Sequence, residues 1–202
     1  MKLKAIISLL SLLALTSGVH AAGNAEAGKN KAAVCFSCHG PNGNSMNPVW
    51  PKLAGQHAEY IAKQLEDFKK GETRKDPLMA GQVAALTNQD MADLGAYFAK
   101  QKVSSAGADE SLVKLGQKIF RAGNKATGVS ACMACHGPTG SGNPAAKFPS
   151  LKGQHAAYTV KALKDFKSGV RNNDAGKMMR NVTALMTDKE IEAVASYIQG
   201  LH

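Results

Sequence analysis

The sequence is poor in aromatic residues and in cysteine, and both shortages limit what it can form. Aromatic residues make up 5% of its 202 residues, with one Trp and four Cys. A chain of this length allows one domain or two. Two domains of about a hundred residues or fewer, with so few aromatic side chains, would need a staple, a metal or a cofactor to complete their cores.

Long apolar runs are also scarce, and the only one lies at the N-terminus. Lys2 and Lys4 precede the apolar segment 5–16, and small residues near Ala21 suit a cleavage site. This pattern is typical of a secretory signal peptide, whereas a membrane-spanning helix needs ~20 apolar residues. We therefore expect residues 1–21 to be a signal peptide, and the mature protein to be soluble and periplasmic.

All four cysteines lie in two copies of one motif. Residues 35–39 and 132–136 both read Cys-x-x-Cys-His and are both followed by Gly-Pro. This spacing is typical of covalent haem attachment, in which the thiols form thioethers and the histidine ligates the iron. Disulfides, a thioredoxin-like pair and zinc sites are the alternatives, but the adjoining histidine and the repetition favour haem. We predict two haem c groups attached at these residues: Cys35, Cys38, Cys132 and Cys135, with His39 and His136 as iron ligands.

The motifs belong to an internal duplication. The segment 50–57, which ends in Gly-Gln-His, recurs at 148–155, and 65–71 recurs at 163–169. Two repeats of about 90 residues indicate a duplicated small domain and not a solenoid. We expect a signal peptide at 1–21, an N-terminal domain at 22–103, a linker at 104–109 and a C-terminal domain at 110–202.

The periodicity predicts an all-α fold, with each domain wrapped around one haem. Apolar residues in 60–68 follow the spacing of one helical face. The last helix of each half opens with a capping-box pattern, Thr87-x-x-Asp90 and Thr187-x-x-Glu190. No stretch shows the period-two alternation of a half-buried strand, so we expect no sheet.

A haem that only transfers electrons needs a second axial ligand, and methionine is a common choice because it raises the reduction potential. Alignment of the two capping boxes pairs Met79 with Met179, which we predict as the ligands of haem 1 and haem 2. Met178 remains an alternative, because the residues that follow it resemble those that follow Met79. His57 and His155 are further alternatives, although their positions suit helix N-termini, where each would be hydrogen-bonded to a neighbour.

Two prolines are candidates to orient the axial histidines. A ligating imidazole usually donates its other N–H to a carbonyl or a carboxylate. Pro51 and Pro149 lie twelve and thirteen residues beyond His39 and His136. We therefore predict that each rigid proline segment supplies the carbonyl.

With these motifs, the chain resembles the cytochrome c4 family, exported di-haem cytochromes built from two class I cytochrome c domains in tandem. The resemblance rests on the haem motifs, the Pro-x-Leu-x-Gly-Gln segments, the late methionines and the ending Ser-Tyr-Ile-Gln-Gly-Leu-His at 196–202. It implies two haems near each other across a domain interface and electron transfer towards terminal oxidases. It also implies iron ligation by the pairs His39 with Met79 and His136 with Met179, and the carbonyls of Pro51 and Pro149 as histidine partners.

Together, the residues and the resemblance predict one-electron transfer in a periplasmic respiratory chain and no enzymatic activity, since an iron with both axial positions filled has no open site for a substrate. The expected partners are redox proteins: a membrane-bound terminal oxidase as acceptor, and a quinol-oxidising complex or a cytochrome as donor. A loose association with the membrane is left open, and nucleic acid is not expected. The alternative is a di-haem oxidoreductase such as a peroxidase, with one haem accessible to substrate.

Charge is unevenly distributed between the halves. Residues 22–107 contain ten Lys/Arg and eight Asp/Glu, a net charge of +2, whereas 108–202 contain thirteen and seven, a net charge of +6. This difference is either an ordinary solvated surface or a dipole that steers the C-terminal domain onto an acidic partner.

Overall fold

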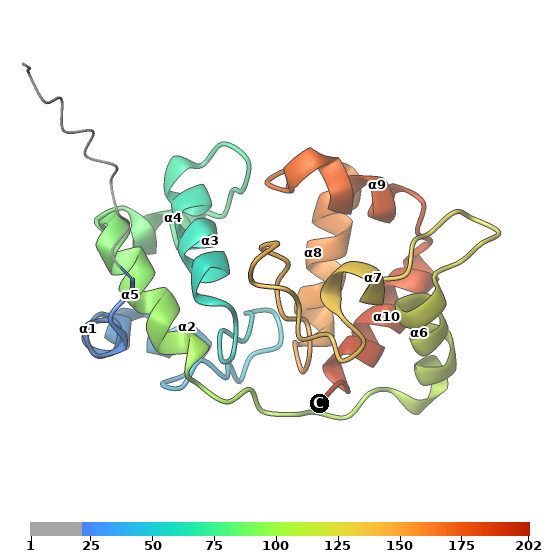
Figure 1. Cartoon of the computed structure of the whole chain (residues 1–202), viewed down its shortest axis with the longest axis horizontal. Coiled ribbons are helices and arrows are strands. Elements are labelled where there is room, and N and C mark those ends of the chain that lie inside the picture. Colours follow the sequence, from blue (N-terminus) through green and yellow to red (C-terminus); the bar gives the residue numbers. More distant parts are fainter. Residues whose placement is uncertain (1–21) are drawn as a thin grey trace, which may run out of the picture.

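The computed structural model describes residues 22–202, which form helices joined by loops (Figure 1). The predicted signal peptide, 1–21, lies outside the described residues. Within them, two isolated bridges occur, Asn124 to Val129 and Asn143 to Phe148, and no strands assemble into a sheet. None of the helices in this part of the chain combines the length and the apolar character needed to cross a bilayer. The prediction of an all-α fold is confirmed.

The two halves repeat one set of helices. The first half contains α1 (Ala25–Lys31), η1 (Ala32–Cys35), α2 (Phe36–His39), α3 (Ala58–Lys70), α4 (Pro77–Val83) and α5 (Asn88–Ala99). The second contains α6 (Glu110–Ala122), α7 (Met133–His136), α8 (Ala156–Ser168), η2 (Ala175–Lys177), α9 (Met178–Ala184) and α10 (Asp188–Gln199). In each half the last helix contacts both the first helix and the long central helix. In the first half α5 contacts α1 and α3, and in the second α10 contacts α6 and α8. The duplication in the sequence is thus a duplication of structure.

Both predicted capping boxes are present. Thr87 Oγ1 accepts a hydrogen bond from the N–H of Asp90 at 3.2 Å, and Asp90 Oδ2 accepts one from the N–H of Thr87 at 2.8 Å. Thr187 and Glu190 form the same pair of bonds at 3.2 and 2.8 Å. The two boxes fix the start of the last helix at equivalent places in each half, so they also fix the register of the residues before them.

A glycine allows the first and last helices of each half to cross at close range. A Cβ atom on Gly28 would lie 2.0 Å from the carbonyl oxygen of Asp93, and one on Gly116 would lie 2.2 Å from that of Ala193. Neither distance is possible for a real side chain, so the backbones of the two helices meet directly. In each half, this crossing holds the helix that precedes the haem motif against the last helix.

The two hydrophobic cores differ in size. The first is formed by four buried residues: Ala32, Ile61, Leu94 and Phe98. The second is formed by eight: Ile119, Phe120, Val129, Met186, Ile191, Val194, Tyr197 and Ile198. The smaller core of the first half agrees with the expectation that a cofactor completes it.

The segment between α5 and α6 runs along one edge of both halves and is held by each (Figure 1). Lys52 Nζ donates to the carbonyl of Ser104 at 2.7 Å, and the N–H of Ser104 donates to Asn44 Oδ1 at 2.8 Å. At the other end, the N–H of Asp109 donates to Ser196 Oγ at 2.8 Å. The connection is therefore anchored to the first half near its start and to the second half at its end.

Two arginines bridge the halves near α3 and α8. Arg74 Nη2 donates to Tyr158 Oη, and Arg171 Nη2 donates to Tyr60 Oη, both at 2.8 Å. Tyr60 and Tyr158 occupy equivalent positions of the repeat, so the contact is nearly symmetric. Gln64 breaks the symmetry, because its Oε1 accepts a hydrogen bond from both guanidinium groups.

Two glutamines form a second, more symmetric link. Gln56 Nε2 donates to the carbonyl of Ser150 at 2.8 Å, and Gln56 Oε1 accepts the N–H of Ser150 at 2.9 Å. Gln154 binds the N–H and the carbonyl of Lys52 in the same way, both at 2.9 Å. We call these four bonds the glutamine clasp. Each glutamine satisfies both backbone groups of one residue in the opposite half.

Removal of either bridging hydroxyl is expected to destabilise the protein. Hydrogen bonds to charged groups contribute ~1.5–3 kcal/mol, so Tyr60→Phe and Tyr158→Phe should each lower the free energy of unfolding by about that amount in urea titrations of the mature protein. Tyr97→Phe is the control, because that hydroxyl donates to the carbonyl of Pro41 at an exposed site and should cost ~1 kcal/mol or less. Equal losses in all three variants would contradict a special role for the arginine bridges.

Lys31 Nζ and Asp90 Oδ1 form an ion pair at 2.5 Å. We expect this pair to make the free energy of unfolding depend on pH in the acid range. Hydrogen bonds from Lys31 and then Thr87 lower the pKa of Asp90 from 3.8 to about 2. Because the folded pKa is the lower one, this stabilisation is complete above the unfolded pKa and is lost as the pH falls towards 2. Lys31→Met should therefore be less stable than the parent at about pH 5, and the difference should shrink towards about pH 2. Urea titrations across this range, with Lys29→Met as control, measure it; a difference independent of pH would contradict the assignment.

Candidate functional site

Each Cys-x-x-Cys-His motif forms about one helical turn. Cys35 ends η1 and Cys38 lies in α2, while Cys132 precedes α7 and Cys135 lies within it. Residues three apart in a helix share a face, so the two sulfur atoms of a pair project to the same side of the turn. The turn can therefore present two thiols to one edge of a flat group.

The histidine of each motif is buried and oriented. His39 and His136 are each 7% exposed, and their Nδ1 atoms lie 2.8 Å from the carbonyl oxygen of Pro51 and 2.9 Å from that of Pro149. A carbonyl can only accept, so Nδ1 carries the hydrogen and Nε2 presents its lone pair. The predicted proline partners are confirmed.

The same burial keeps both imidazoles neutral. Burial lowers the pKa of His39 and of His136, and the hydrogen bond to the proline carbonyl opposes this only in part. Neutral imidazole, with one nitrogen protonated and the other free, is the form that ligates a metal. The donor set therefore fits a haem iron.

The first cysteine of each motif has a raised pKa, unlike a redox-active thiol. Burial raises the pKa of Cys35, and it raises that of Cys132 to about 11. Redox-active cysteines instead have a lowered pKa and react as thiolates. This observation speaks against a thioredoxin-like pair, which requires a lowered pKa.

One cavity of the first half joins the haem motif to the distant methionine. Its lining includes Cys35, Cys38, His39 and Met79. In the sequence, Met79 lies forty residues after His39. Aromatic and proline side chains from the same half also line it: Trp50, Pro51 and Phe68. The cavity thus combines two thiols, an imidazole, a thioether and apolar walls, which is the set that a covalently held haem requires.

The second half closes part of this cavity. Tyr158, Val170 and Arg171 belong to the C-terminal half, yet they line the cavity that contains His39. Arg171 is 8% exposed and reaches across to Tyr60. The first site is therefore completed only when the two halves are docked.

The register of α4 and α9 favours Met179 as the counterpart of Met79. Val83 and Thr183, exactly one hundred positions apart, are 1% and 0% exposed. Met79 and Met179 have the same separation and are both half-buried. Met178 is 42% exposed and lies at the first position of α9.

The two histidines after the Gly-Gln segments precede α3 and α8, as predicted. His155 Nε2 lies 2.9 Å from the carbonyl oxygen and 3.0 Å from the hydroxyl of Ser45 in the other half. For Nε2 of His57 the predicted hydrogen bond is wrong, because this atom is buried without a partner among residues 22–202. Gly142 occupies the position that corresponds to Ser45 and has no hydroxyl, so one of the two partners of His155 has no counterpart for His57.

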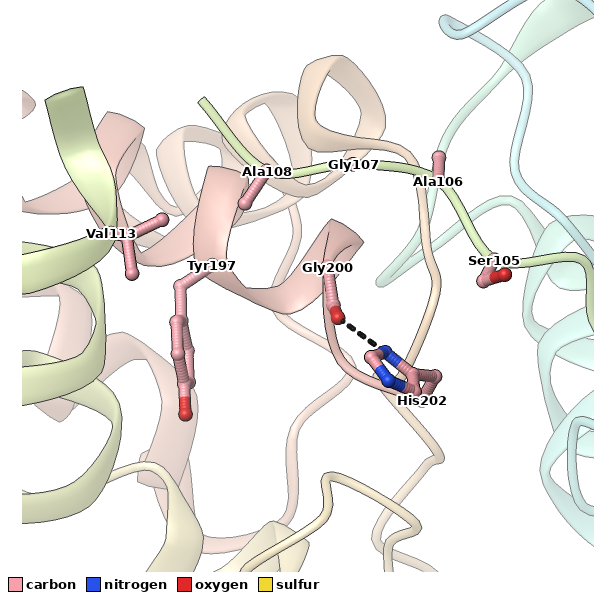
Figure 2. Close-up of a pocket in the computed structure, with 8 residues that line it drawn as sticks. All are labelled: Ser105, Ala106, Gly107, Ala108, Val113, Tyr197, Gly200 and His202. Carbon is pink, nitrogen blue, oxygen red and sulfur yellow. Dashed lines mark hydrogen bonds between the residues drawn. The ribbon is translucent and has the colours of Figure 1, made fainter. Parts of the chain in front are cut away.

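A second cavity, of about 400 Å³, lies between the linker and the end of α10 (Figure 2). Its lining contains no cysteine or methionine, and its titratable side chains are Tyr197 and His202. The ring of His202 turns back to the carbonyl of Gly200, with Nδ1 at 2.9 Å (Figure 2). Across residues 22–202, no group of three or more His, Cys, Asp or Glu side chains could hold a bare metal ion. Within residues 22–202, the haem motifs therefore remain the candidate functional sites.

Comparison with known proteins finds the same organisation elsewhere. The family description "cytochrome c" matches residues 25–102 and 113–202. The chain is 51% identical to cytochrome c4 of Stutzerimonas stutzeri, over 98% of this chain and 99% of the relative. It is 50% identical to cytochrome c4 of Pseudomonas aeruginosa, with the same coverage of both. A crystal structure of reduced recombinant cytochrome c4 from Pseudomonas stutzeri matches with a TM-score of 0.87 at 51% identity, covering 90% of this chain and all of the other (100%).

Proposed function

Because the chain belongs to the cytochrome c4 family of di-haem electron carriers, we propose that it transfers single electrons within a periplasmic respiratory chain. In this proposal a quinol-oxidising complex or another cytochrome donates the electrons, and a membrane-bound terminal oxidase accepts them. The predicted family, the two cytochrome c domains and the two haem c groups are confirmed. The protein is an electron carrier and not an enzyme.

We propose the following haem ligands and domain boundaries. Haem 1 is held by Cys35 and Cys38, with His39 and Met79 on its iron, and haem 2 by Cys132 and Cys135, with His136 and Met179. The domains extend over 22–103 and 110–202, with the linker at 104–109. The observation that carries the proposal is the single cavity that contains the first motif together with Met79.

The haem supplies a reversible ferrous–ferric couple, and the chain's residues determine how that couple behaves. His39 offers Nε2 in a fixed direction because the carbonyl of Pro51 holds Nδ1. The thioether of Met79 would ligate the same iron, and with both ligands bound the iron would have no open site for a substrate. Apolar residues such as Trp50 and Phe68, with Tyr158 and Arg171 from the other half, line the cavity that would surround the haem. A closed site of this kind favours electron transfer and disfavours ligand chemistry.

The methionine assignment can be tested by spectroscopy. Met–iron ligation gives a weak near-red band in the ferric protein, so Met79→Ala and Met179→Ala should each remove about half of its intensity if both haems have His/Met ligation. Met178→Ala should leave the band intact, as should the control Met91→Leu, in a side chain that is 2% exposed in the core. Loss of about half of the band in Met178→Ala, with full intensity retained in Met179→Ala, would transfer the ligand role to Met178.

The proposed acceptor and the charge difference between the halves can be tested together. If the more basic C-terminal domain docks on an acidic oxidase surface, oxidation of the reduced protein by oxidase-containing membranes should slow as salt rises. Neutralising exposed Lys177 should slow it about twofold at low salt. Asn suits this position, because Lys177 has a left-handed backbone with φ 59°.

Lys75→Gln in the first half is the matched control and should have a smaller effect. Equal effects of Lys177→Asn and Lys75→Gln would contradict docking through the C-terminal domain. Failure of the membranes to oxidise the protein at any ionic strength would refute the proposed acceptor.

A further inference from the structure

The peptide group between Pro51 and Lys52 has two partners in different halves of the molecule. Its carbonyl oxygen accepts the Nδ1 hydrogen of His39 at 2.8 Å. Its N–H donates to Oε1 of Gln154, in the second half, at 2.9 Å. One planar peptide group therefore lies between the axial histidine of the first domain and a side chain of the second.

The same arrangement occurs at the second histidine, with the roles of the two halves exchanged. The carbonyl oxygen of Pro149 accepts the Nδ1 hydrogen of His136 at 2.9 Å. The next N–H, that of Ser150, donates to Oε1 of Gln56, in the first half, at 2.9 Å. The glutamine clasp thus connects each axial histidine to the opposite domain.

The two glutamines are held firmly enough to influence these peptide groups. Gln154 Nε2 donates to the carbonyl of Lys52 at 2.9 Å, and its Oε1 also accepts the N–H of His155 at 3.0 Å. Gln56 makes the equivalent bonds, and it is only 9% exposed. In such low-dielectric surroundings, hydrogen bonds in a chain polarise one another.

The direction of this polarisation follows from the chemistry of the amide. When the N–H of a peptide donates to an acceptor, electron density shifts towards the carbonyl oxygen of the same peptide, which then accepts more strongly. A stronger acceptor on Nδ1 makes the imidazole a more basic ligand. A more basic ligand stabilises ferric over ferrous iron, so it lowers the reduction potential.

We propose that each domain tunes the axial histidine of the other, with Gln154 lowering the reduction potential of haem 1 through Pro51 and Gln56 lowering that of haem 2 through Pro149. The inference rests on the proposed ligation by His39 and His136. Both glutamines are positioning residues, because they act on the iron only through a peptide group and an imidazole.

A coupling between redox state and domain docking follows. If the clasp favours the ferric state, then oxidation of a haem must strengthen the clasp to the same extent, because the coupling free energy is reciprocal. The reduced protein therefore holds its two domains together less tightly than the oxidised protein does. The effect requires no movement of the iron ligands.

The crossed pattern gives a specific test in the haem-loaded protein. Met has about the length of Gln but cannot replace its hydrogen bonds, so Gln154→Met should raise the reduction potential of haem 1, with about a threefold change in its reduction equilibrium constant. Gln56→Met should do the same for haem 2. Each variant should change the potential of the other haem much less. The potentials are measured by spectroelectrochemical titration, with the hyperfine-shifted haem methyl signals in NMR spectra identifying each haem.

A second readout reports on the histidine itself. In the ferrous protein, the Nδ1–H signal of His39 should move in Gln154→Met and stay in place in Gln56→Met, and that of His136 should do the reverse. Gln199→Met is the control, because Gln199 bonds the linker carbonyl of Gly107 and neither proline peptide; it should move neither potential. If Gln154→Met does not fold, Gln154→Glu serves instead, and its stronger acceptor should lower the potential of haem 1.

Three results would overturn the proposal: equal shifts of both haems in either variant, a larger shift of the haem in the glutamine's own domain, or no shift. Each would reduce the clasp to an ordinary structural contact while leaving electron transfer intact. Failure of the proposed function looks different, because the parent protein itself would then lack the absorption spectrum of His/Met-ligated haem, and the inference would fall with it.

Discussion

The hydrogen bond from each motif histidine to a proline carbonyl is the interaction on which the rest of the structure depends. It selects the tautomer that leaves Nε2 free, and it fixes the ring within a buried wall. It also requires the chain to return past the motif within about a dozen residues, which places the Gly-Gln segment that follows at the surface of the domain. There the other domain contacts it, so the iron site and the interface share one short stretch of backbone. A change at either place is therefore transmitted to the other through a single peptide group.

The duplication provides two similar sites, and a few substitutions make them different. Gln64 accepts hydrogen bonds from Arg74 and Arg171, whereas its counterpart in the second half, Ala162, can accept none through its side chain. His155 is bonded to Ser45 while the Nε2 atom of His57 is left without a partner. The first cavity is also lined by Arg74 and Arg171, and Arg171 is only 8% exposed. Equivalent candidate ligands are therefore surrounded by different polar contacts in the two halves.

The sequence predicted the parts of the site that depend on local spacing. Cys35, Cys38 and His39 share one turn, and the carbonyl of Pro51 is within reach of that turn, so pattern and chemistry were sufficient. The capping boxes were equally local, since all their bonds span three residues. The interface was not predictable in this way. Gln56 and Ser150 are 94 positions apart, and nothing in either segment indicates which residue of the other half it meets. The available signal was the repetition of Gly-Gln in both halves, and it indicated equivalence but not contact.

The polar character of the interface suits a tethered pair of domains. The clasp and the arginine bridges are hydrogen bonds, which contribute only ~0.5–3 kcal/mol each and would hold two separate proteins weakly. The linker, anchored at Ser104 and Asp109, keeps the halves at an effective concentration of about the millimolar range or above, so weak contacts are enough. An apolar interface of greater strength would respond little to one electron. Directional hydrogen bonds that end on the axial histidines can respond, because their strength depends on the charge of the iron. Tethering thus allows the contact between the domains to remain sensitive to the redox state that it helps to set.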